Sequence, residues 1–228
     1  RKQGTTVRVW PDAKYFESVQ IPHAELVHLL RSKAVLMPGV TVQLIDEKKK
    51  DTQSWQYKGG LRDYLEQSLT ADAVIPLFEG EGYAGKDDDS FAEGEGAQWV
   101  LAFTEDGHPV RESYVNLIAT TAGGTHDSGL RDGLFQAVKG FIELHALLPK
   151  GVKLMPEDVF ARASYVLSAK VLDPQFQGQI KERLNSRDAV RLVSSFVKPA
   201  LELWLNANVE HGKKLAELAI KAAQTRQR

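Results

Sequence analysis

A glycine pair, Gly59–Gly60, interrupts the hydrophobic pattern of this 228-residue chain and divides it into two unequal parts. Glycine adopts backbone conformations that end helices and strands, so such a pair is typical of a boundary between folded units. The part before it is short, and a domain of about 60 residues is only marginally stable alone because it buries a small share of its surface. We therefore expect two units, 1–60 and 61–228, with the missing half of the first unit lying upstream.

The first unit carries the patterns of a strand, a helix and a hairpin. Residues 5–10 alternate polar and apolar side chains and end at Pro11, which predicts a strand. Apolar residues at helical spacing follow Pro22, so a helix is expected from there to Pro38. Alternation resumes on both sides of the charged stretch 46–51, which indicates a hairpin with a solvated, lysine-rich tip.

The second unit mixes strands and helices. Hydrophobic periodicity predicts, in order, a helix at 61–69, strands at 98–104 and 111–118, a helix at 130–148, a strand at 163–172 and helical structure at 188–228. The glycine- and acid-rich run 80–96 is expected to be a mobile surface loop, and Pro199 is expected to kink or restart the last helix. This order of elements predicts an α/β (α+β) fold.

The C-terminal helical stretch has a clear apolar side, which needs a partner surface either in its own domain or in a different chain. The residues on that side are Leu201, Trp204, Leu205, Val209, Leu215, Leu218 and Ala222.

The composition excludes several kinds of chemistry. The chain has no cysteine, which removes disulfides, thiolate metal sites and cysteine nucleophiles together and fits a reducing, cytoplasmic setting. No run of about 18 apolar residues is present, so no transmembrane span is expected. The net charge is -1, so contact with DNA has to rest on local basic patches. The stretch from Glu79 to Asp106 contains nine acidic residues and one basic residue, whereas the stretch from Arg187 to the end contains eight basic and four acidic residues.

Three patterns are weak candidates for a catalytic, cofactor or metal site. Gly80–Gly85 matches G-x-G-x-x-G, but a dinucleotide-binding loop must open a helix, and acids on both sides of this one would repel a phosphate. Thr125–Ser128 brings Ser, His and Asp together only as sequence neighbours, which cannot form a catalytic triad. We expect instead that Thr125 or Asp127 caps a helix after Gly123–Gly124. The six histidines have no metal-ligand spacing, so no metal site is expected.

A loop lysine is a more informative polar residue. Lys181 and Gln179 follow Asp173–Pro174, which ends a predicted strand, and a turn at Gly178. A lysine beside a glutamine amide can hold a phosphate, with the lysine as a point charge and the amide as a hydrogen-bond donor. A lysine that is merely solvated is the simpler alternative.

Three segments, in the same order along the chain, resemble the B subunits of type IIA DNA topoisomerases. Gly4–Asp12, which reads GTTVRVWPD, resembles the strand that closes their GHKL-type ATP pocket. Gly123–Gly129 matches their transducer signature G-G-T-H-x-x-G. Asp173–Lys181 matches their loop D-P-x-F-x-x-Q-T-K, except that Ile180 replaces the threonine. Residues 112–118, together with Ile180–Leu184, are more similar to the topoisomerase IV protein than to the gyrase protein.

The resemblance implies a domain organisation and a set of site residues. Residues 1–60 would be the C-terminal part of a GHKL ATPase sandwich, and residues 61–228 a transducer like domain 2 of ribosomal protein S5, with a long C-terminal helix. By position, Thr5 would hydrogen-bond around the adenine of ATP and Val7 would line its pocket. Gln179 and Lys181 would reach the γ-phosphate, where Lys181 would act as a sensor and stabilise charge in phosphoryl transfer.

The resemblance also implies which parts of the ATP site lie elsewhere. The family's catalytic glutamate and Mg²⁺-binding asparagine would precede Gly4. ATP and Mg²⁺ are therefore expected cofactors of the intact protein, and the isolated chain is expected to bind neither and to be inactive.

The implied function is that of the ATPase component of topoisomerase IV. ATP binding and hydrolysis would drive closure of a gate and passage of a DNA duplex, for decatenation and relaxation in chromosome segregation. The implied partners are DNA, the ParC-type A subunit of topoisomerase IV and a second copy of the B subunit joined through the N-terminal region, with no membrane. The alternatives are a fragment of the gyrase B subunit, or a non-catalytic coupling and DNA-interaction module. An RNA-binding domain is disfavoured because no stretch interleaves aromatic and basic residues.

Overall fold

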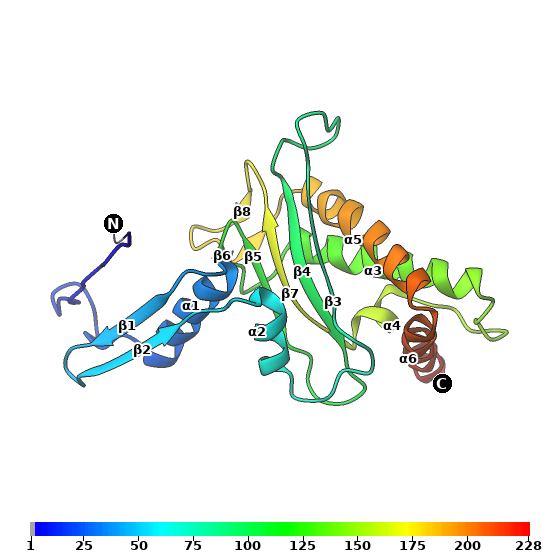
Figure 1. Ribbon diagram of the computed structural model, residues 1–228, viewed down its shortest axis with the longest axis horizontal. Coiled ribbons are helices and arrows are strands. Elements are labelled where there is room, and N and C mark those ends of the chain that lie inside the picture. Colours follow the sequence, from blue (N-terminus) through cyan, green and yellow to red (C-terminus); the bar gives the residue numbers. More distant parts are fainter. Residues whose placement is uncertain (1–2) are drawn as a thin grey trace. The chain divides into compact units, whose positions relative to one another are not determined.

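The computed structural model describes residues 3–228 and contains helices and strands in mixed order, which confirms the expected α/β (α+β) class. The chain divides into two compact units, one ending at Lys58 and the other beginning at Gly59. Figure 1 gives the element labels used below. Within residues 3–228, no helix is long and apolar enough to cross a membrane.

The first unit consists of a helix, a hairpin and a long irregular segment. α1 (His23–Leu36) and the hairpin of β1 (Val42–Asp46) and β2 (Asp51–Trp55) are formed as the sequence predicted, and α1 contacts β1. The last part of α1 is its buried part and contains Ser32, Ala34, Val35 and Leu36.

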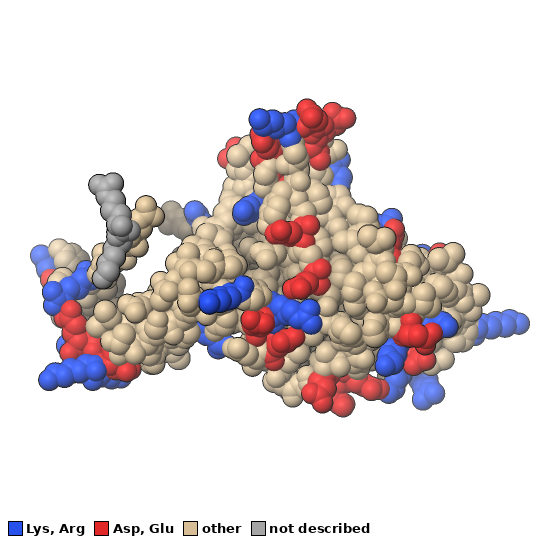
Figure 2. All heavy atoms as spheres, viewed as in Figure 1, with Lys and Arg blue, Asp and Glu red and all other residues tan. Residues whose placement is uncertain are grey.

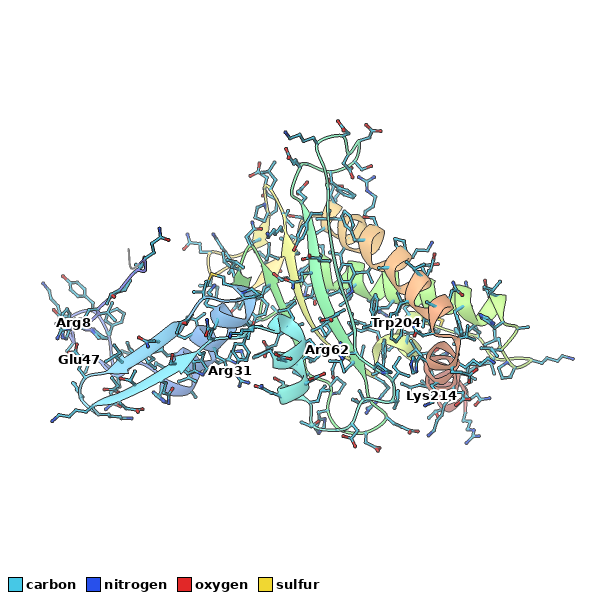
Figure 3. The ribbon with its side chains drawn as sticks, viewed as in Figure 1. Arg8, Arg31, Glu47, Arg62, Trp204 and Lys214 are labelled. Carbon is cyan, nitrogen blue, oxygen red and sulfur yellow. The ribbon has the colours of Figure 1, made fainter. Side chains whose placement is uncertain are left out.

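A strand at residues 5–10 is not formed, so that prediction was wrong. These residues have irregular backbone and pair with neither strand of the β1–β2 hairpin. Val7 and Trp10 are 79% and 70% exposed. An alternating pattern becomes a strand only where a neighbouring edge accepts its backbone hydrogen bonds, and the described part of this unit supplies no such pairing. A surface ion pair of 2.6 Å between Arg8 and Glu47 links the segment to the hairpin tip (Figure 3).

The second unit is built on a five-stranded sheet with the order β3-β4-β7-β5-β6. β5 and β7 are parallel, and the other neighbouring pairs are antiparallel. Two parallel strands need a crossover connection, which here contains the long helix α3 (Thr125–Leu144). The strands are β3 Phe78–Tyr83, β4 Gly96–Phe103, β5 Arg111–Val115, β6 Ile118–Ala119 and β7 Ala163–Lys170.

Helices cover both faces of this sheet. Besides α3 they are α2 Gly60–Ser68, α4 Pro156–Phe160, α5 Asp188–Ala207 and α6 Val209–Gln227. In Figure 1, α2 lies in front of the sheet against β4 and β7, while α3 and α5 pack together behind it. Alternate residues of β4, among them Trp99, Leu101 and Phe103, point into the core shared with α3 and α5.

The run 80–96 is not a loop throughout, so that prediction was wrong for its first residues, which belong to β3. Bulky side chains occupy the space that side chains on these glycines would need. A Cβ on Gly80 would lie 2.7 Å from the ring of Trp99, and one on Gly82 would lie 2.3 Å from the ring of Phe196. These glycines therefore allow bulky side chains to lie close to the backbone of a strand. A sequence pattern cannot distinguish a glycine of this kind from one in a turn.

The C-terminal helices find their partner surface within their own unit. Leu201, Leu205 and Leu215 are buried in the core formed with α3 and the sheet. The expected restart at Pro199 does not occur, because α5 runs through this proline and ends at Ala207, with Asn208 between α5 and α6. The Asn208 side chain there donates a 2.8 Å hydrogen bond to a carbonyl of the last turn, which satisfies an otherwise unpaired acceptor.

Candidate functional site

The predicted phosphate-binding loop is the tip of a small hairpin, residues 175–186, hereafter the Lys181 hairpin. Its strands are β8 (Phe176–Gln177) and β9 (Arg183–Leu184), paired antiparallel. Two further bonds close its base: the backbone N–H of Asn185 donates to the carbonyl of Gln175 at 2.7 Å, and the Gln175 N–H donates to the Ser186 hydroxyl at 2.8 Å. The sequence therefore folds this segment into a closed loop with a defined base.

The tip presents a cation to solvent. Gln179, Ile180 and Lys181 are exposed, and the Lys181 ammonium lies 5.7 Å from the centre of the Phe176 ring. In the part of the chain that the structure describes, no carboxylate forms a salt bridge with Lys181. Its backbone has φ +58, a left-handed conformation that costs a residue with a side chain about 1 kcal/mol. A ligand anion would therefore meet a lysine whose charge is available and whose backbone is held in an uncommon conformation.

Backbone hydrogen bonds join this hairpin to the start of α3. The Ala122 N–H donates to the Glu182 carbonyl at 2.9 Å, and the Leu184 N–H donates to the Gly123 carbonyl at 3.1 Å. Gly124 forms a parallel bridge with Leu184, and a Cβ on Gly124 would lie 2.5 Å from the Leu184 carbonyl oxygen. Leu184 itself is fully buried. Gly123–Gly124 and the Lys181 hairpin, about 60 residues apart in the sequence, are thus directly connected.

A buried hydrogen-bond network lies beneath that connection. His126 Nε2 is 2.9 Å from the Thr120 hydroxyl, and this hydroxyl donates to the Ser113 carbonyl at 2.9 Å. The Asp127 carboxylate accepts hydrogen bonds from Ser113 Oγ at 3.0 Å and from the Tyr165 hydroxyl at 2.6 Å. Since Asp127 bonds to side chains of the sheet, it does not cap α3, and neither does Thr125. The capping prediction was wrong because the sheet competes for the carboxylate.

Burial shifts the protonation of this network. His126 is completely inaccessible to solvent, and burial lowers its pKa, although the nearby Asp127 carboxylate opposes that effect. Burial also raises the pKa of Tyr165, and the adjacent Asp127 charge raises it further. Both side chains are therefore neutral at pH 7 and act here as hydrogen-bonding groups.

The other two predicted nucleotide contacts lie in the first unit. Thr5 and Val7 are exposed residues of the irregular segment that precedes α1. Gln179 and Lys181, by contrast, share the tip of one hairpin. Sequence reasoning missed Thr120 and the hydrogen bonds that join it to Ser113 and His126, because no short motif links residues that meet only when the sheet and α3 pack together.

Charge on the second unit is uneven. Residues 84–95 form a loop between β3 and β4, and Asp87, Asp88 and Asp89 lie at its tip, where Figure 2 shows a cluster of acidic side chains at the top of the view. A phosphate would be repelled from that tip. The exposed lysine of the Lys181 hairpin is the better candidate for an anion.

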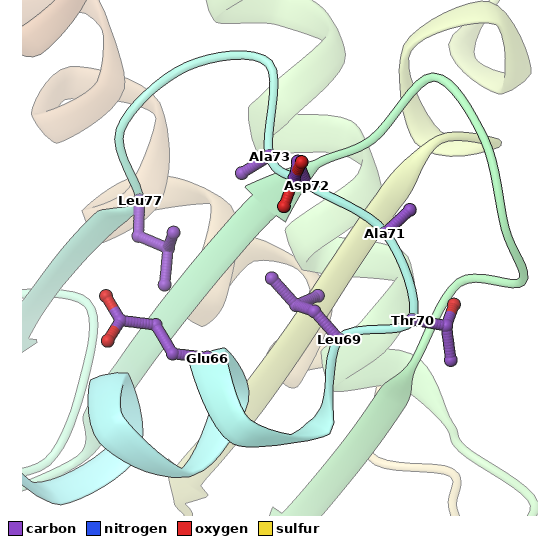
Figure 4. A pocket seen from close by; sticks show the side chains of 7 residues that line it. All are labelled: Glu66, Leu69, Thr70, Ala71, Asp72, Ala73 and Leu77. Carbon is purple, nitrogen blue, oxygen red and sulfur yellow. The ribbon is translucent and has the colours of Figure 1, made fainter.

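A shallow hollow of about 340 Å³ lies beside the end of α2 (Figure 4). Two carboxylates, those of Glu66 and Asp72, face it, so it does not suit an anion. None of the predicted site residues is among those that line it, which are Glu66, Leu69, Thr70, Ala71, Asp72, Ala73 and Leu77. Within residues 3–228, no group of His, Asp and Glu side chains could hold a metal ion.

Comparison with known proteins identifies the family. A family model described as DNA gyrase B matches residues 60–228, which is most of the chain. The chain belongs to the DNA gyrase B family. Its relatives include the B subunit of DNA topoisomerase 4 from Pseudomonas aeruginosa, 47% identical over 99% of this chain, and that from Escherichia coli, 45% identical over 100% of it. The chain spans about a third of these relatives, 35% of the length of each.

Solved structures of this family have the same fold. A topoisomerase IV ATP binding domain of Francisella tularensis, solved with a small-molecule inhibitor, matches with a TM-score of 0.78 and 35% identity, over 96% of this chain and 58% of that one. The 43K ATPase domain of Thermus thermophilus gyrase B matches with a TM-score of 0.77 at 23% identity, over 95% of this chain and 57% of that one. The resemblance to the B subunits of type IIA topoisomerases, and to topoisomerase IV in particular, is thereby confirmed.

Proposed function

We propose that this chain is the ATP-responsive coupling part of a topoisomerase IV B subunit. The observation that carries the proposal is the Lys181 hairpin, which presents an exposed lysine without a carboxylate partner among the described residues, on a loop that backbone hydrogen bonds hold to the core. A gyrase-B-family chain with such a lysine in the D-P-x-F-x-x-Q-x-K loop is suited to detecting a terminal phosphate.

The two units have different roles in this proposal. Residues 1–60 are the C-terminal part of the GHKL ATPase domain, where Thr5 hydrogen-bonds around the adenine and Val7 lines its pocket. Residues 61–228 are the transducer, whose Gln179 and Lys181 contact the γ-phosphate. Both side chains at the hairpin tip are chemically suited to a phosphate, since one is a cation and the other an amide donor.

Magnesium enters with the nucleotide in this proposal. Bound Mg²⁺ would neutralise phosphate charge in the intact protein. The contribution of this chain is made by Gln179 and Lys181, which supply a hydrogen-bond donor and a positive charge to the same phosphate.

ATP acts through a difference in contacts between two states. Lys181 meets the γ-phosphate only when the transducer is rotated towards the nucleotide, so ATP favours that state by the free energy of the contact. Loss of the γ-phosphate on hydrolysis removes the contact and lets the gate reopen. Lys181 also stabilises negative charge that develops during phosphoryl transfer.

The intact protein works in the cytoplasm with DNA, with the A subunit of topoisomerase IV and with a second copy of itself, and it closes a gate around a transported DNA duplex. Ile180, which replaces the family's threonine, is 74% exposed at the hairpin tip, so its side chain leaves the contacts of its two neighbours unobstructed.

A single substitution in the full-length protein tests this function. Lys181→Ala is expected to lower kcat/KM for ATP hydrolysis by on the order of 100-fold, as for other single groups that stabilise transition-state charge. ATP-dependent decatenation should fall with it. Lys150→Ala, at another exposed loop lysine of the same unit, is the matched control and should keep both activities. Near-normal ATPase and DNA passage in Lys181→Ala would reject the assignment.

A further inference from the structure

We propose that Gly124 and the buried Thr120–His126 hydrogen bond are positioning elements, which hold the Lys181 hairpin in the conformation that meets the γ-phosphate. This inference rests on the proposed function, because it concerns how the same lysine is placed. None of the positioning groups touches the nucleotide. They act through the backbone of residues 122–124, which contacts the hairpin directly.

Hydrogen bonds join the two ends of the segment Thr120–His126, hereafter the clasp. Between side chains, the His126 ring is 2.9 Å from the Thr120 hydroxyl. Between backbone groups, the Gly123 N–H donates to the Thr120 carbonyl at 2.9 Å. Between these closures, Ala122 and Gly123 make the two backbone hydrogen bonds to the hairpin. The groups that hold the hairpin are therefore fixed by a bond between the two ends of their own segment.

The direction of the hydrogen bonds in this clasp is determined by its acceptors. When the Thr120 hydroxyl donates to the Ser113 carbonyl, it accepts from His126, whose Nε2 then carries the ring hydrogen. A hydrogen on Nε2 suits the Asp127 carboxylate, which is 3.6 Å from this nitrogen. A valine at position 120 would keep the shape of the side chain but remove the hydroxyl's bonds to the His126 ring and to the Ser113 carbonyl. The ring N–H would then lack a partner, whereas the Ser113 carbonyl would keep the backbone N–H of Thr120. A serine would restore both bonds.

The sheet supports the clasp from below. Asp127 follows His126 in α3 and binds Ser113 on β5 and Tyr165 on β7. Networks of buried polar groups become rigid when their members are paired, because any displacement leaves a desolvated polar group unsatisfied. The start of α3 is consequently fixed to the sheet. The backbone hydrogen bonds of Ala122 and Gly123 in turn fix the hairpin to the start of α3.

Gly124 is the closest contact between the clasp and the hairpin. A Cβ there would lie 2.5 Å from the Leu184 carbonyl oxygen and 2.6 Å from its nitrogen, both of them backbone atoms. The backbone φ of Gly124, +150, also disfavours a side chain. An alanine at this position has to push β9 away. Since Lys181 is only three residues from Leu184, its ammonium moves with the strand.

The test compares ATP with ADP in the full-length protein, because only ATP carries the phosphate that Lys181 contacts. The variants are Gly124→Ala, Lys181→Ala, the double variant and Gly140→Ala, whose added Cβ enters open space on α3. Misplacement of a reacting group by about 1 Å can cost on the order of 100-fold in rate. We expect Gly124→Ala to reduce kcat/KM for ATP by about 10- to 100-fold, with ADP affinity unchanged and no further loss in the double variant.

The possible outcomes separate the two proposals. If Lys181→Ala behaves like wild type, the proposed function fails and this inference fails with it. If Lys181→Ala loses activity while Gly124→Ala keeps it, only the positioning role is overturned. A Gly124→Ala variant that weakens ADP and ATP equally, or that adds its full effect to Lys181→Ala, has suffered general damage and also contradicts the inference.

A second pair of variants covers the case in which Gly124→Ala does not fold. Thr120→Val should reproduce the selective loss of ATP turnover and speed hydrogen exchange at the Leu184 amide, which is bonded to Gly123. Thr120→Ser should restore both. Equal behaviour of the valine and serine variants would show that the hydroxyl has no positioning role.

Discussion

The guanidinium of Arg226, in the last turn of α6, holds the buried carboxylate of Asp158 at the start of α4. Arg226 Nε and Nη2 donate to the two carboxylate oxygens at 3.1 and 3.0 Å, and the Asp158 side chain is only 3% exposed. The same carboxylate accepts the Met155 N–H at 2.7 Å. A long-range ion pair therefore ties the C-terminal helix to the core of the second unit.

Replacing Arg226 by alanine should lower the melting temperature of the chain by a few degrees, because it leaves a buried carboxylate without its cation. Arg226 is itself partly exposed, so water will offset some of the loss. Arg228→Ala, at the exposed C-terminal residue, is the control and should melt like wild type. Identical melting of the Arg226 and Arg228 variants, followed by circular dichroism, would contradict a stabilising role for the pair.

Gly82→Ala should destabilise the chain by about 1–3 kcal/mol, because the new Cβ would overlap the Phe196 ring, which packs over β3 from α5. Gly85→Ala is the matched control, since its Cβ would meet no atom within 4 Å. Urea unfolding of both variants measures the difference. If the two variants unfold at the same urea concentration, the close packing between Phe196 and β3 is not a stabilising constraint.

The isolated chain should bind ATP too weakly to detect by calorimetry at millimolar nucleotide. Small-molecule sites bury most of their ligand, whereas Thr5, Val7, Gln179 and Lys181 are all exposed. The Lys181→Ala chain serves as the blank. Binding in the micromolar range that Lys181→Ala abolishes would mean that residues within this chain are sufficient for the site.

Much of the fold followed from periodicity alone. The helices α1, α2 and α3, the β1–β2 hairpin and the strands β4 and β7 were all predicted from the spacing of apolar residues and the turn residues between them. The failures share a cause that lies outside local sequence. Residues 5–10 have no partner strand among the described residues, whereas Gly80 and Gly82 pair with β4 and lie against the rings of Trp99 and Phe196.

The candidate site was predictable only in part. Gln179 and Lys181 could be chosen from their loop and its family resemblance. The connection of that loop to Gly124 could not, since the contact joins segments about 60 residues apart through backbone atoms. The prediction that Asp127 caps α3 was wrong for a related reason. Tyr165, from the far end of the crossover, takes the carboxylate that a local pattern would have assigned to the helix terminus.

The buried histidine should make stability depend on pH. Burial lowers the pKa of His126 in the folded chain, so below the unfolded value of about 6.5 the unfolded chain binds a proton that the folded chain does not. Stability should therefore fall as the pH decreases from about 6.5 towards the lowered pKa, by at most about 1.4 kcal/mol per pH unit from this group. His126→Gln, which keeps a donor for Thr120 but does not titrate, should lack this component.

The measurement is urea unfolding of the two chains between pH 7.5 and 5, at constant ionic strength. Asp127 and the other carboxylates are common to both, so the difference between the curves isolates His126. The advantage of the wild-type chain over His126→Gln should shrink steadily as the pH falls below about 6.5. A difference that stays constant with pH would show that His126 has the same proton affinity folded and unfolded, and that its burial does not hold it neutral.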